Sequence, residues 1–388
     1  MTETIDFRDP RTGTHGWLVY DGDGRSRPLA AGGCRVQAGL DAGQLATLAE
    51  RMTLKQRVLG LNVDGAKCGI DLDPRSPHKA AALGSFLAFL RHELRTRFSM
   101  GSDMGTDWQE LLDHGARAGV PSVKYAIRSA QGLSDDEFFV RMGVLNERVG
   151  HLKLSQLRAG HALGHAAIAA ARAAGSTGRP TVAMQGFGNL GRGAAHALLR
   201  DGARLVAVAD ADGTVVDARG LDVDAMLRRP LRTPVPAMAG RSMPTRRSLF
   251  GVPADVLVLA AGADALDTDH AATVPVGAVA VGANCGLSEQ VEGALHRRGV
   301  FVVPDFIGGI GGSASMEALF GPAVPPEPEQ LLRTLSDLMR DLVGDIAAAT
   351  RETGTSPRNA ALRLAEHTDT DPAARPYGNC RYLTVHSA

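Results

Sequence analysis

Residues 180–191 read PTVAMQGFGNLG, an apolar run that leads into three glycines at GxGxxG spacing. The run 180–185 predicts a buried β-strand, and the residues after the glycines predict a helix to about Arg200. Glycines in such a turn let a pyrophosphate approach the helix N-terminus, where amide groups and the helix dipole favour negative charge. We therefore expect a dinucleotide-binding turn, with a glycine-rich turn that holds no ligand as the alternative. The residues expected to contact the dinucleotide are Gly186, Phe187, Gly188, Asn189 and Leu190.

The sequence after this turn continues as alternating strands and helices. A strand over 204–209 ends at Asp210, where a carboxylate could hold a ribose hydroxyl. Asp-Ala-Asp-Gly at 210–213 is also an ordinary turn signal, which is the competing interpretation of this aspartate. Further apolar runs are typical of buried parallel strands: 256–259, 276–281 and 300–303. The alternation predicts a doubly wound α/β sheet over about 180–310.

Weaker patterns flank this domain. We expect strands at 16–20, 70–72 and near Val123, and helices over 41–59, 76–97, 154–174, 329–354 and 357–367. Proline-rich residues 322–328 predict a linker, and most of 119–153 has no clear pattern. Asp41 and Ser76 are the expected N-caps of the first two helices, and Thr106 with Gln109 fits a capping box for a further one.

Composition narrows the class of protein. The 388 residues are enough for two domains, and 42 acidic residues balance 42 basic ones. A neutral chain gives no electrostatic case for nucleic acid or an anionic membrane as the main partner. The four cysteines have no paired spacing that would predict a disulfide framework or a zinc site. The start of the sequence lacks the regions of a signal peptide and no run is long enough to span a membrane, so we expect a cytoplasmic protein.

Lysine is rare in this chain, with five residues against 37 arginines. Arginine stays protonated, whereas a desolvated lysine can lose its proton and act as a base, so each lysine is a candidate for a special role. Lys67 lies in DGAKCG, where the flanking glycines let backbone and ligand come close. Lys55 lies twelve residues upstream on the apolar face of the 41–59 helix. The alternative for both is a packed stem with its ammonium group in water.

Asp103 is the candidate acid. It lies in SMGSDMGTDWQ at 99–109, beside glycine and ahead of the expected helix cap, so capping does not explain it. An aspartate close to a lysine of lowered pKa could carry protons between substrate and solvent. A solvated loop aspartate is the alternative.

These segments, in this order, resemble the glutamate/leucine/phenylalanine/valine dehydrogenase family. The resemblance covers most of the chain and rests on segments spread along it: AGGCR at 31–35, MTLK at 52–55, GAKCG at 65–69, SDMGT at 102–106, Ala260-Ala261, GAN at 282–284, VPDFIGGIGG at 303–312 and SPRNAA at 356–361. Two lysines at a spacing of twelve with their glycines are a specific signal. A Rossmann turn alone would not be.

The resemblance implies two domains with the active site in the cleft between them. An α/β substrate and oligomerisation domain would span 1–157 and 335–388, and a Rossmann-like domain 158–334. Lys55 would bind the substrate carboxylate beside Gly33, Lys67 with a lowered pKa would activate water, and Asp103 would shuttle the amino-group proton. Hydride would pass between the amino-acid Cα and NAD, with NADP possible, and ammonia would be the second substrate or product. Ala260, Ala261 and Asn284 would contact the cofactor, and the chain would form a homo-oligomer.

Departures from the family pattern bear on the substrate. Glutamate-specific members have a lysine where this chain has Ala31 and a serine near Met316, so we expect a non-acidic 2-amino or 2-oxo acid. Gly309 replaces an asparagine, Asp64 replaces a glycine, and His161 stands roughly where a threonine contacts the nicotinamide.

These departures leave two alternatives open, a reductase acting on an unusual imine or ketone and an idle nucleotide-binding homologue. NAD is expected over NADP because Asp210 would repel a 2′-phosphate. His161 and His165 stand four apart on a helix, but no third ligand is evident nearby, so no metal is expected.

Overall fold

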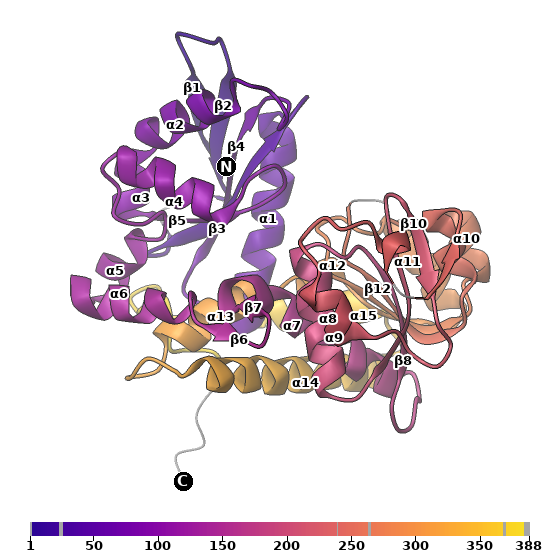
Figure 1. Cartoon of the computed structure of the whole chain (residues 1–388). Coiled ribbons are helices and arrows are strands. Elements are labelled where there is room, and N and C mark those ends of the chain that lie inside the picture. The colour runs from indigo at the N-terminus through magenta and orange to yellow at the C-terminus, as the bar shows by residue number, and fades with distance from the viewer. Residues whose placement is uncertain (1, 23–25, 239, 263–264, 368–369, 384–388) are drawn as a thin grey trace. The chain divides into compact units, whose positions relative to one another are not determined.

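The computed structural model describes the whole chain except residues 1, 23–25, 239, 263–264, 368–369 and 384–388 (Figure 1). Unit 1 comprises Met1–Val140 with Ala365–Thr384, and unit 2 comprises Arg141–Leu364. The predicted boundaries were different, 1–157 with 335–388 and 158–334. The difference arises because the long helix α14 (Pro328–Thr353) packs along α7 (Leu154–Ala173), which places both helices in unit 2.

Unit 1 is built on a five-stranded sheet of order β1-β2-β4-β3-β5. Its strands are β1 (Glu3–Arg8), β2 (His15–Tyr20), β3 (Ala30–Gln37), β4 (Asp64–Asp71) and β5 (Phe98–Ser102). β3 lies between β4 and β5 and is parallel to both, whereas β2 is antiparallel to β1 and β4. The sequence predicted β2 and only the end of β4, because the glycines and alanines of β3 and β4 hide the alternation that marks a strand. β5 was also not predicted.

Helices cover both faces of this sheet. Its core face, with Ala30, Cys34 and Cys68, packs against α2 (Lys79–Phe89), α3 (Arg91–Thr96) and α4 (Trp108–Arg117), and Figure 1 shows α1 (Ala42–Leu59) on the other side. Because side chains alternate along a strand, the Lys67 side chain points toward the side of α1, and Gly33 lies on that same face.

The helix ends of unit 1 differ in part from the predicted ones. Asp41 does cap α1, accepting the Gln44 amide proton. The single helix predicted over 76–97 is two helices that meet at Leu90, and its first turn begins at Lys79 rather than at Ser76. The capping box of α4 uses Asp107 and Glu110 instead of Thr106 and Gln109, because the Thr106 hydroxyl donates to the carbonyl of Cys34.

The stretch 119–153, which the sequence left unassigned, contains both helices and short strands. It contains α5 (Ala126–Gln131), α6 (Asp135–Val144) and the short strands β6 (Arg148–Val149) and β7 (Leu152–Lys153). Val123 is in no strand; its carbonyl accepts the amide proton of Met100 at the sheet edge. Among the described residues, no helix is long and apolar enough to cross a membrane.

Unit 2 contains a seven-stranded sheet of order β11-β10-β9-β8-β12-β13-β14. The strands are β8 (Thr181–Gln185), β9 (Arg204–Asp210), β10 (Gly213–Val216), β11 (Arg241–Met243), β12 (Ala254–Leu259), β13 (Val276–Val281) and β14 (Phe301–Val303). β9, β8, β12, β13 and β14 are parallel, and β10 and β11 form an antiparallel edge. The five parallel strands are those that the sequence predicted. After β8 the chain moves to β9 on one side and later returns to β12 on the other, so the sheet is doubly wound with its switch point at β8 and β12.

The helices of unit 2 were predicted only in part: those over 154–174, from the glycine turn to about Arg200, over 329–354 and over 357–367 were expected, and the others were not placed by the sequence. Besides α7 and α14, the helices of this unit are α8 (Asn189–Arg200), α9 (Val223–Arg228), α10 (Thr268–Thr273), α11 (Glu289–Arg297), α12 (Asp305–Gly308), α13 (Gly311–Phe320) and α15 (Pro357–Glu366). Two short 3-10 helices, η1 (Val235–Ala237) and η2 (Arg246–Gly251), lie near the antiparallel edge.

Candidate active site

Two strands and a loop of unit 1 bring Lys67, Asp103 and Arg35 together. The Lys67 Nζ atom lies 2.8 Å from Asp103 Oδ2, and Arg35 Nε lies 2.9 Å from the same oxygen. Lys67 comes from β4, Arg35 from β3, and Asp103 directly follows β5. Within the described residues, Asp103 Oδ1 has no hydrogen-bond partner. The cluster therefore holds one carboxylate oxygen and leaves the other for a ligand.

Burial and charge set the protonation state of Asp103. Burial alone would raise the pKa of this carboxyl, but the positive charges and hydrogen bonds of Lys67 and Arg35 outweigh it. The pKa of Asp103 lies well below its usual range as a result. Asp103 is thus a carboxylate over the whole pH range in which proteins usually work, with Lys67 and Arg35 as its partners.

Gly33 keeps the space above this pair open. A Cβ atom at Gly33 would lie 3.0 Å from the Asp103 Cβ and 3.2 Å from Lys67 Nζ. The next glycine has a different role, since a Cβ at Gly32 would overlap the carbonyl oxygen of Ala66 on the neighbouring strand. Gly33 is therefore the position where a small ligand can reach both Lys67 and Asp103.

Lys55 is buried in α1, with 4% of its surface exposed. The same helix is joined to the Lys67 strand by a buried hydrogen bond from the Gly65 amide to the Thr53 hydroxyl, 3.1 Å long. A Cβ at Gly65 would lie 2.4 Å from that hydroxyl, so glycine allows α1 to approach β4 this closely. The structure thus confirms that Lys55 is on a buried helix face. It leaves the predicted role in carboxylate binding untested.

Sequence reasoning missed two cations of unit 1. Arg35 is part of the AGGCR segment at 31–35, but the sequence suggested no role for it. In the structure it shares the Asp103 carboxylate with Lys67. Lys124 is buried, with its Nζ atom 3.4 Å from the Ser99 hydroxyl, and Ser99 pairs in register with Ala31. The scarcity of lysine was the only signal that could have singled out Lys124.

Asp64, which replaces a family glycine, has a local structural role. Its carboxylate accepts hydrogen bonds from the Ser26 hydroxyl and the Arg27 amide, each 3.2 Å long. These bonds fasten the segment before β3 to the start of β4.

The glycine turn of unit 2 lies between β8 and α8, as predicted. Gly186 has a φ of 95°, and a Cβ there would lie 2.8 Å from the backbone of Ala260. A Cβ at Gly191 would lie 2.0 Å from the Gly186 carbonyl oxygen. Gly188 is the N-cap of α8, and a Cβ there would meet no atom within 4 Å. The backbone therefore needs two of the glycines, and the third leaves open space at the helix N-terminus that fits a pyrophosphate.

The remaining predicted cofactor residues lie around the same sheet edge. Asn189 and Leu190 form the first turn of α8, and the buried Phe187 packs against the Arg192 guanidinium. Ala260 and Ala261 follow β12, and the half-buried Asn284 lies shortly after β13.

Asp210 at the end of β9 is already engaged by its own unit. Its Oδ1 atom accepts the Asp212 amide proton at 2.9 Å, and its Oδ2 atom accepts the Val235 amide proton at 2.6 Å. The turn interpretation of this aspartate is thus the one that the contacts support.

His161 faces α14 rather than the glycine turn. Its Nε2 atom lies 3.1 Å from the Leu332 carbonyl oxygen and 3.0 Å from the Ser336 hydroxyl. Ser336 also contacts His165 Nε2 at 2.8 Å. Burial, together with the neighbouring His165, His196 and Arg200, holds the pKa of His161 well below its usual range. This histidine is therefore neutral. The helix face that we expected to meet a nicotinamide is used here for packing between helices.

Met316 is buried in α13, the helix that follows the GIGG segment. Arg158 of α7 ties this helix down, donating to the Gly312 carbonyl at 3.1 Å and to the Ser315 hydroxyl. Met316 offers no charge or hydroxyl to a ligand.

Comparison with known proteins decides the family. Residues 159–368 match the family model of the glutamate/leucine/phenylalanine/valine dehydrogenases, and residues 25–112 match that of the Glu/Leu/Phe/Val dehydrogenase dimerisation domain. The chain belongs to this family.

Several family members are similar over most of this chain. Glutamate dehydrogenase of Aeropyrum pernix is 27% identical over 294 residues, covering 72% of this chain and 66% of that protein. Glutamate dehydrogenase B of Halobacterium salinarum is 29% identical over 296 residues, covering 72% and 64%. The matched segments thus span less than two thirds of these relatives.

Solved structures agree with the two-unit fold. A hetero-hexameric glutamate dehydrogenase from Thermus thermophilus, in its Leu-bound form, has a TM-score of 0.73 and 28% identity, and the match covers 95% of this chain and 88% of that one. L-tryptophan dehydrogenase from Nostoc punctiforme has a TM-score of 0.60 at 16% identity, covering 94% and 95%, and shows the shared fold alone. This family member therefore has a substrate-domain-like α/β unit and a Rossmann-like unit.

Proposed function

We propose that this family member is an amino-acid dehydrogenase that interconverts a non-acidic 2-amino acid and its 2-oxo acid with a nicotinamide dinucleotide. The observation that supports this most is the Asp103 carboxylate, held by Lys67 and Arg35 beside the space above Gly33. A carboxylate next to an ammonium group, with one oxygen left for a ligand, suits proton transfer to and from a substrate amino group.

The residues of unit 1 divide the work as follows. Lys55 binds the substrate carboxylate, and Asp103 takes a proton from the amino group as the Cα–H bond is broken. Lys67, once it has released its own proton to solvent, removes a proton from the water that adds to the resulting imine. Asp103 returns its proton to the departing amino group, so that ammonia leaves and the 2-oxo acid remains. The dinucleotide, when bound, accepts the hydride from Cα in this direction and returns it in the other.

In unit 2, the first turn of α8 and the open space at Gly188 hold the pyrophosphate of the dinucleotide. Ala260, Ala261 and Asn284 line the strand ends where the rest of the molecule lies. The sequence favoured NAD because of a free carboxylate at Asp210. Since both oxygens of that carboxylate accept backbone hydrogen bonds, this reason for NAD has no support from the contacts.

The substrate side chain is proposed to be apolar or aromatic. Ala31 in unit 1 is half buried and brings no cation, and Met316 in unit 2 brings no hydroxyl. Burying a second carboxylate without a partner would cost several kcal/mol, whereas burying an apolar side chain gains roughly 1.5–3 kcal/mol.

A panel of 2-oxo acids with ammonia, followed by the absorbance of NADH and NADPH, tests the proposal. We expect turnover of apolar or aromatic 2-oxo acids that depends on ammonia. Turnover without ammonia would favour the reductase of an unusual imine or ketone. No turnover of any substrate, with intact dinucleotide binding, would favour an idle homologue.

We also propose that the chain forms a homo-oligomer. The match of residues 25–112 to a dimerisation-domain model supports this. Light scattering of the purified protein tests it, and a molar mass of one chain at micromolar concentration would contradict it.

A further inference from the structure

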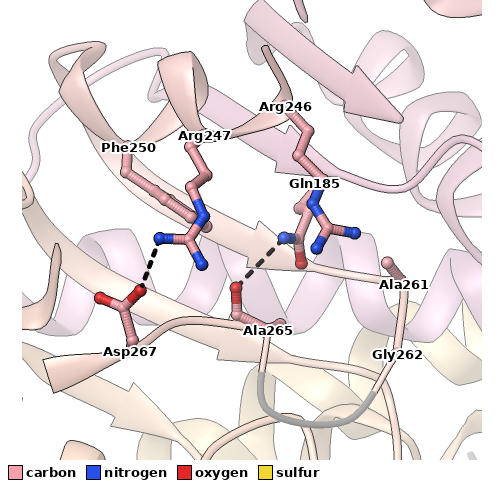
Figure 2. Close-up of a pocket in the computed structure, with 8 residues that line it drawn as sticks. All are labelled: Gln185, Arg246, Arg247, Phe250, Ala261, Gly262, Ala265 and Asp267. Atoms are coloured by element: carbon pink, nitrogen blue, oxygen red, sulfur yellow. Dashed lines mark hydrogen bonds and ion pairs between the residues drawn. The ribbon is translucent and has the colours of Figure 1, made fainter. Parts of the chain in front are cut away.

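A cavity lies at the switch point of the unit 2 sheet. Its volume is about 160 Å³, and it is lined by Gln185 at the end of β8, Ala261 and Gly262 after β12, and Arg246, Arg247 and Phe250 of η2 (Figure 2). In open α/β sheets, ligands bind outside the carboxyl ends of the strands at this point. The cavity is thus where the adenosine half of a dinucleotide would lie, apart from the pyrophosphate position at Gly188.

Gln185, one of the residues that line this cavity, has a buried acceptor. Gln185 is 7% exposed, and its Nε2 atom donates to the Ala265 carbonyl at 3.2 Å. Its Oε1 atom is buried and has no hydrogen-bond partner among the residues that the structure describes. A buried amide oxygen without a donor is destabilising, so the cavity favours a ligand that brings a donor such as a ribose hydroxyl or an adenine amino group.

The two arginines of η2 differ in their ion pairing. Figure 2 shows both guanidinium groups extending from η2 toward the strand ends. Arg247 lies 3.2 Å from Asp267 Oδ2, which neutralises much of its charge. Arg246 has no ion-pair partner within the described parts of the chain, and its guanidinium lies beside Gln185 in Figure 2. One positive charge at this cavity is therefore available to a ligand.

Hydrogen bonds place the start of η2 next to β10, the strand that follows β9. The Thr214 hydroxyl donates to the carbonyls of Thr245 at 2.8 Å and Arg246 at 3.4 Å, so the first residues of η2 lie against the start of β10. β10 begins directly after the turn that Asp210 closes with Asp212. The start of η2 thus lies next to the strand that follows β9, and the Asp210 carboxylate at the end of β9 is occupied by backbone amides. The adenosine ribose of such a ligand would lie at this strand end.

We infer that Arg246 binds the 2′-phosphate of NADP, so that this chain prefers NADP to NAD. The inference rests on the proposed function, whose dinucleotide it specifies, and it reverses the preference predicted from Asp210. A guanidinium matches a phosphate with two parallel hydrogen bonds, and NAD has only a hydroxyl at this place. The Gln185 Oε1 atom accepts a hydrogen bond from the adenosine, and Arg247 stays paired with Asp267.

Calorimetric titration of the full chain, without any amino acid, tests the inference apart from catalysis. The probes are NADP, NAD, 2′,5′-ADP and 5′-AMP. We expect wild type to bind NADP over NAD, and 2′,5′-ADP over 5′-AMP, by about 10- to 100-fold, the range of a hydrogen-bonded charge pair. Raising the salt concentration should narrow both ratios, because salt screens an exposed charge.

Arg246→Ala should remove most of this discrimination by weakening NADP and 2′,5′-ADP binding, with NAD affinity within about threefold of wild type. Arg246→Lys should keep part of it, because a lysine still brings a positive charge. Arg219→Ala is the matched control, since Arg219 is an exposed arginine of the same unit whose partner is Asp217, and it should change nothing.

Equal or tighter binding of NAD by wild type would overturn the inference and leave the dehydrogenase proposal standing. Equal losses of NAD and NADP in Arg246→Ala would also overturn it, because the arginine would then serve the fold or a part common to both ligands. Failure of wild type to bind either dinucleotide would contradict both the inference and the proposed function.

Discussion

At the residue scale, the ion pair between Lys67 and Asp103 carries the proposed chemistry. We expect Lys67→Ala to reduce kcat by at least about 100-fold, the usual contribution of a general base, and to leave dinucleotide affinity unchanged. Lys67→Arg should be nearly as inactive, although it keeps the charge next to Asp103, because arginine does not give up its proton. Steady-state kinetics with titration calorimetry measures both effects. Lys153→Ala, at an exposed lysine, is the control, and a Lys67→Arg enzyme of near-normal rate would contradict the role of base.

A substitution at Gly33 tests whether a ligand uses the space above Lys67 and Asp103. A methyl group there would lie 3.0 Å from Asp103 Cβ and 3.2 Å from Lys67 Nζ, so we expect Gly33→Ala to displace both side chains and the ligand. Activity should fall by at least about tenfold, which corresponds to roughly 1.4 kcal/mol. Gly344→Ala is the matched control, because a Cβ at this helical glycine meets nothing within 4 Å and should raise stability by roughly 0.5–1 kcal/mol. Normal kinetics in Gly33→Ala would show that the substrate lies elsewhere.

Asp103 also makes stability depend on pH. The folded-state pKa of Asp103 is depressed, so its contribution is present above the unfolded pKa of about 3.9 and is lost as pH falls toward the folded value. Asp103→Asn leaves two nearly buried cations without their carboxylate and should destabilise unit 1 by about 3–5 kcal/mol at neutral pH. Chemical denaturation from pH 7 to pH 3 should show this difference shrinking below about pH 4. A difference that grows on acidification would contradict the assignment.

At the scale of elements, one partly buried arginine fastens α15 to α11 and α12. Arg358 donates to both oxygens of Glu292, at 2.6 and 2.7 Å, and to Asp305 at 3.0 Å. The Asp305 carboxylate also accepts the amide proton of Cys285, a residue with a φ of 54°. α11, α12 and α15 therefore share a single guanidinium.

Arg358→Ala would leave two buried carboxylates without their cation. We expect a loss of about 3–5 kcal/mol in the free energy of unfolding of unit 2. Arg351→Ala, at an exposed arginine of α14, should change stability by less than about 0.5 kcal/mol. Thermal unfolding with hydrogen exchange measures both, and amides of α11 and α15 should lose protection first in Arg358→Ala. Similar unfolding of the two variants would show that the network adds nothing to stability.

At the scale of the whole molecule, the proposal that the substrate side chain is apolar or aromatic predicts the choice of substrate. Wild type should use glutamate at least about tenfold less efficiently than its best apolar amino acid, because Ala31 and Met316 offer the second carboxylate neither a cation nor a hydroxyl. Ala31→Lys should raise activity on glutamate relative to the apolar substrate, measured as the ratio of kcat/KM values. Glutamate efficiency within tenfold of the best apolar substrate would contradict the proposal. Lys124, which binds Ser99 beside Ala31, would then be the cation to replace with methionine.

Local patterns determined much of the fold and part of the site. The spacing of apolar residues, the positions of glycines and the N-cap residues depend only on neighbours in sequence. They predict the parallel strands of unit 2, the turn at 186–191 and the long helices. Lys67 and Asp103 stood out for a similar reason, because a rare lysine between glycines and an aspartate outside a helix cap are unusual in themselves. The strand β3 was not predicted because its small residues carry no alternation.

Contacts between distant residues were decided only by the tertiary structure. Arg35 meets Asp103 because β3 and β5 pair in parallel, and the sharing of one carboxylate oxygen by Arg35 and Lys67 depends on that register. Asp210 is engaged by Val235, and His161 by α14, through partners 25 or more positions away. Sequence alone identified which residue types this protein has for its chemistry. Register and helix packing decided which of them touch, because a hydrogen bond needs its two atoms within about 3 Å and no local pattern specifies that distance.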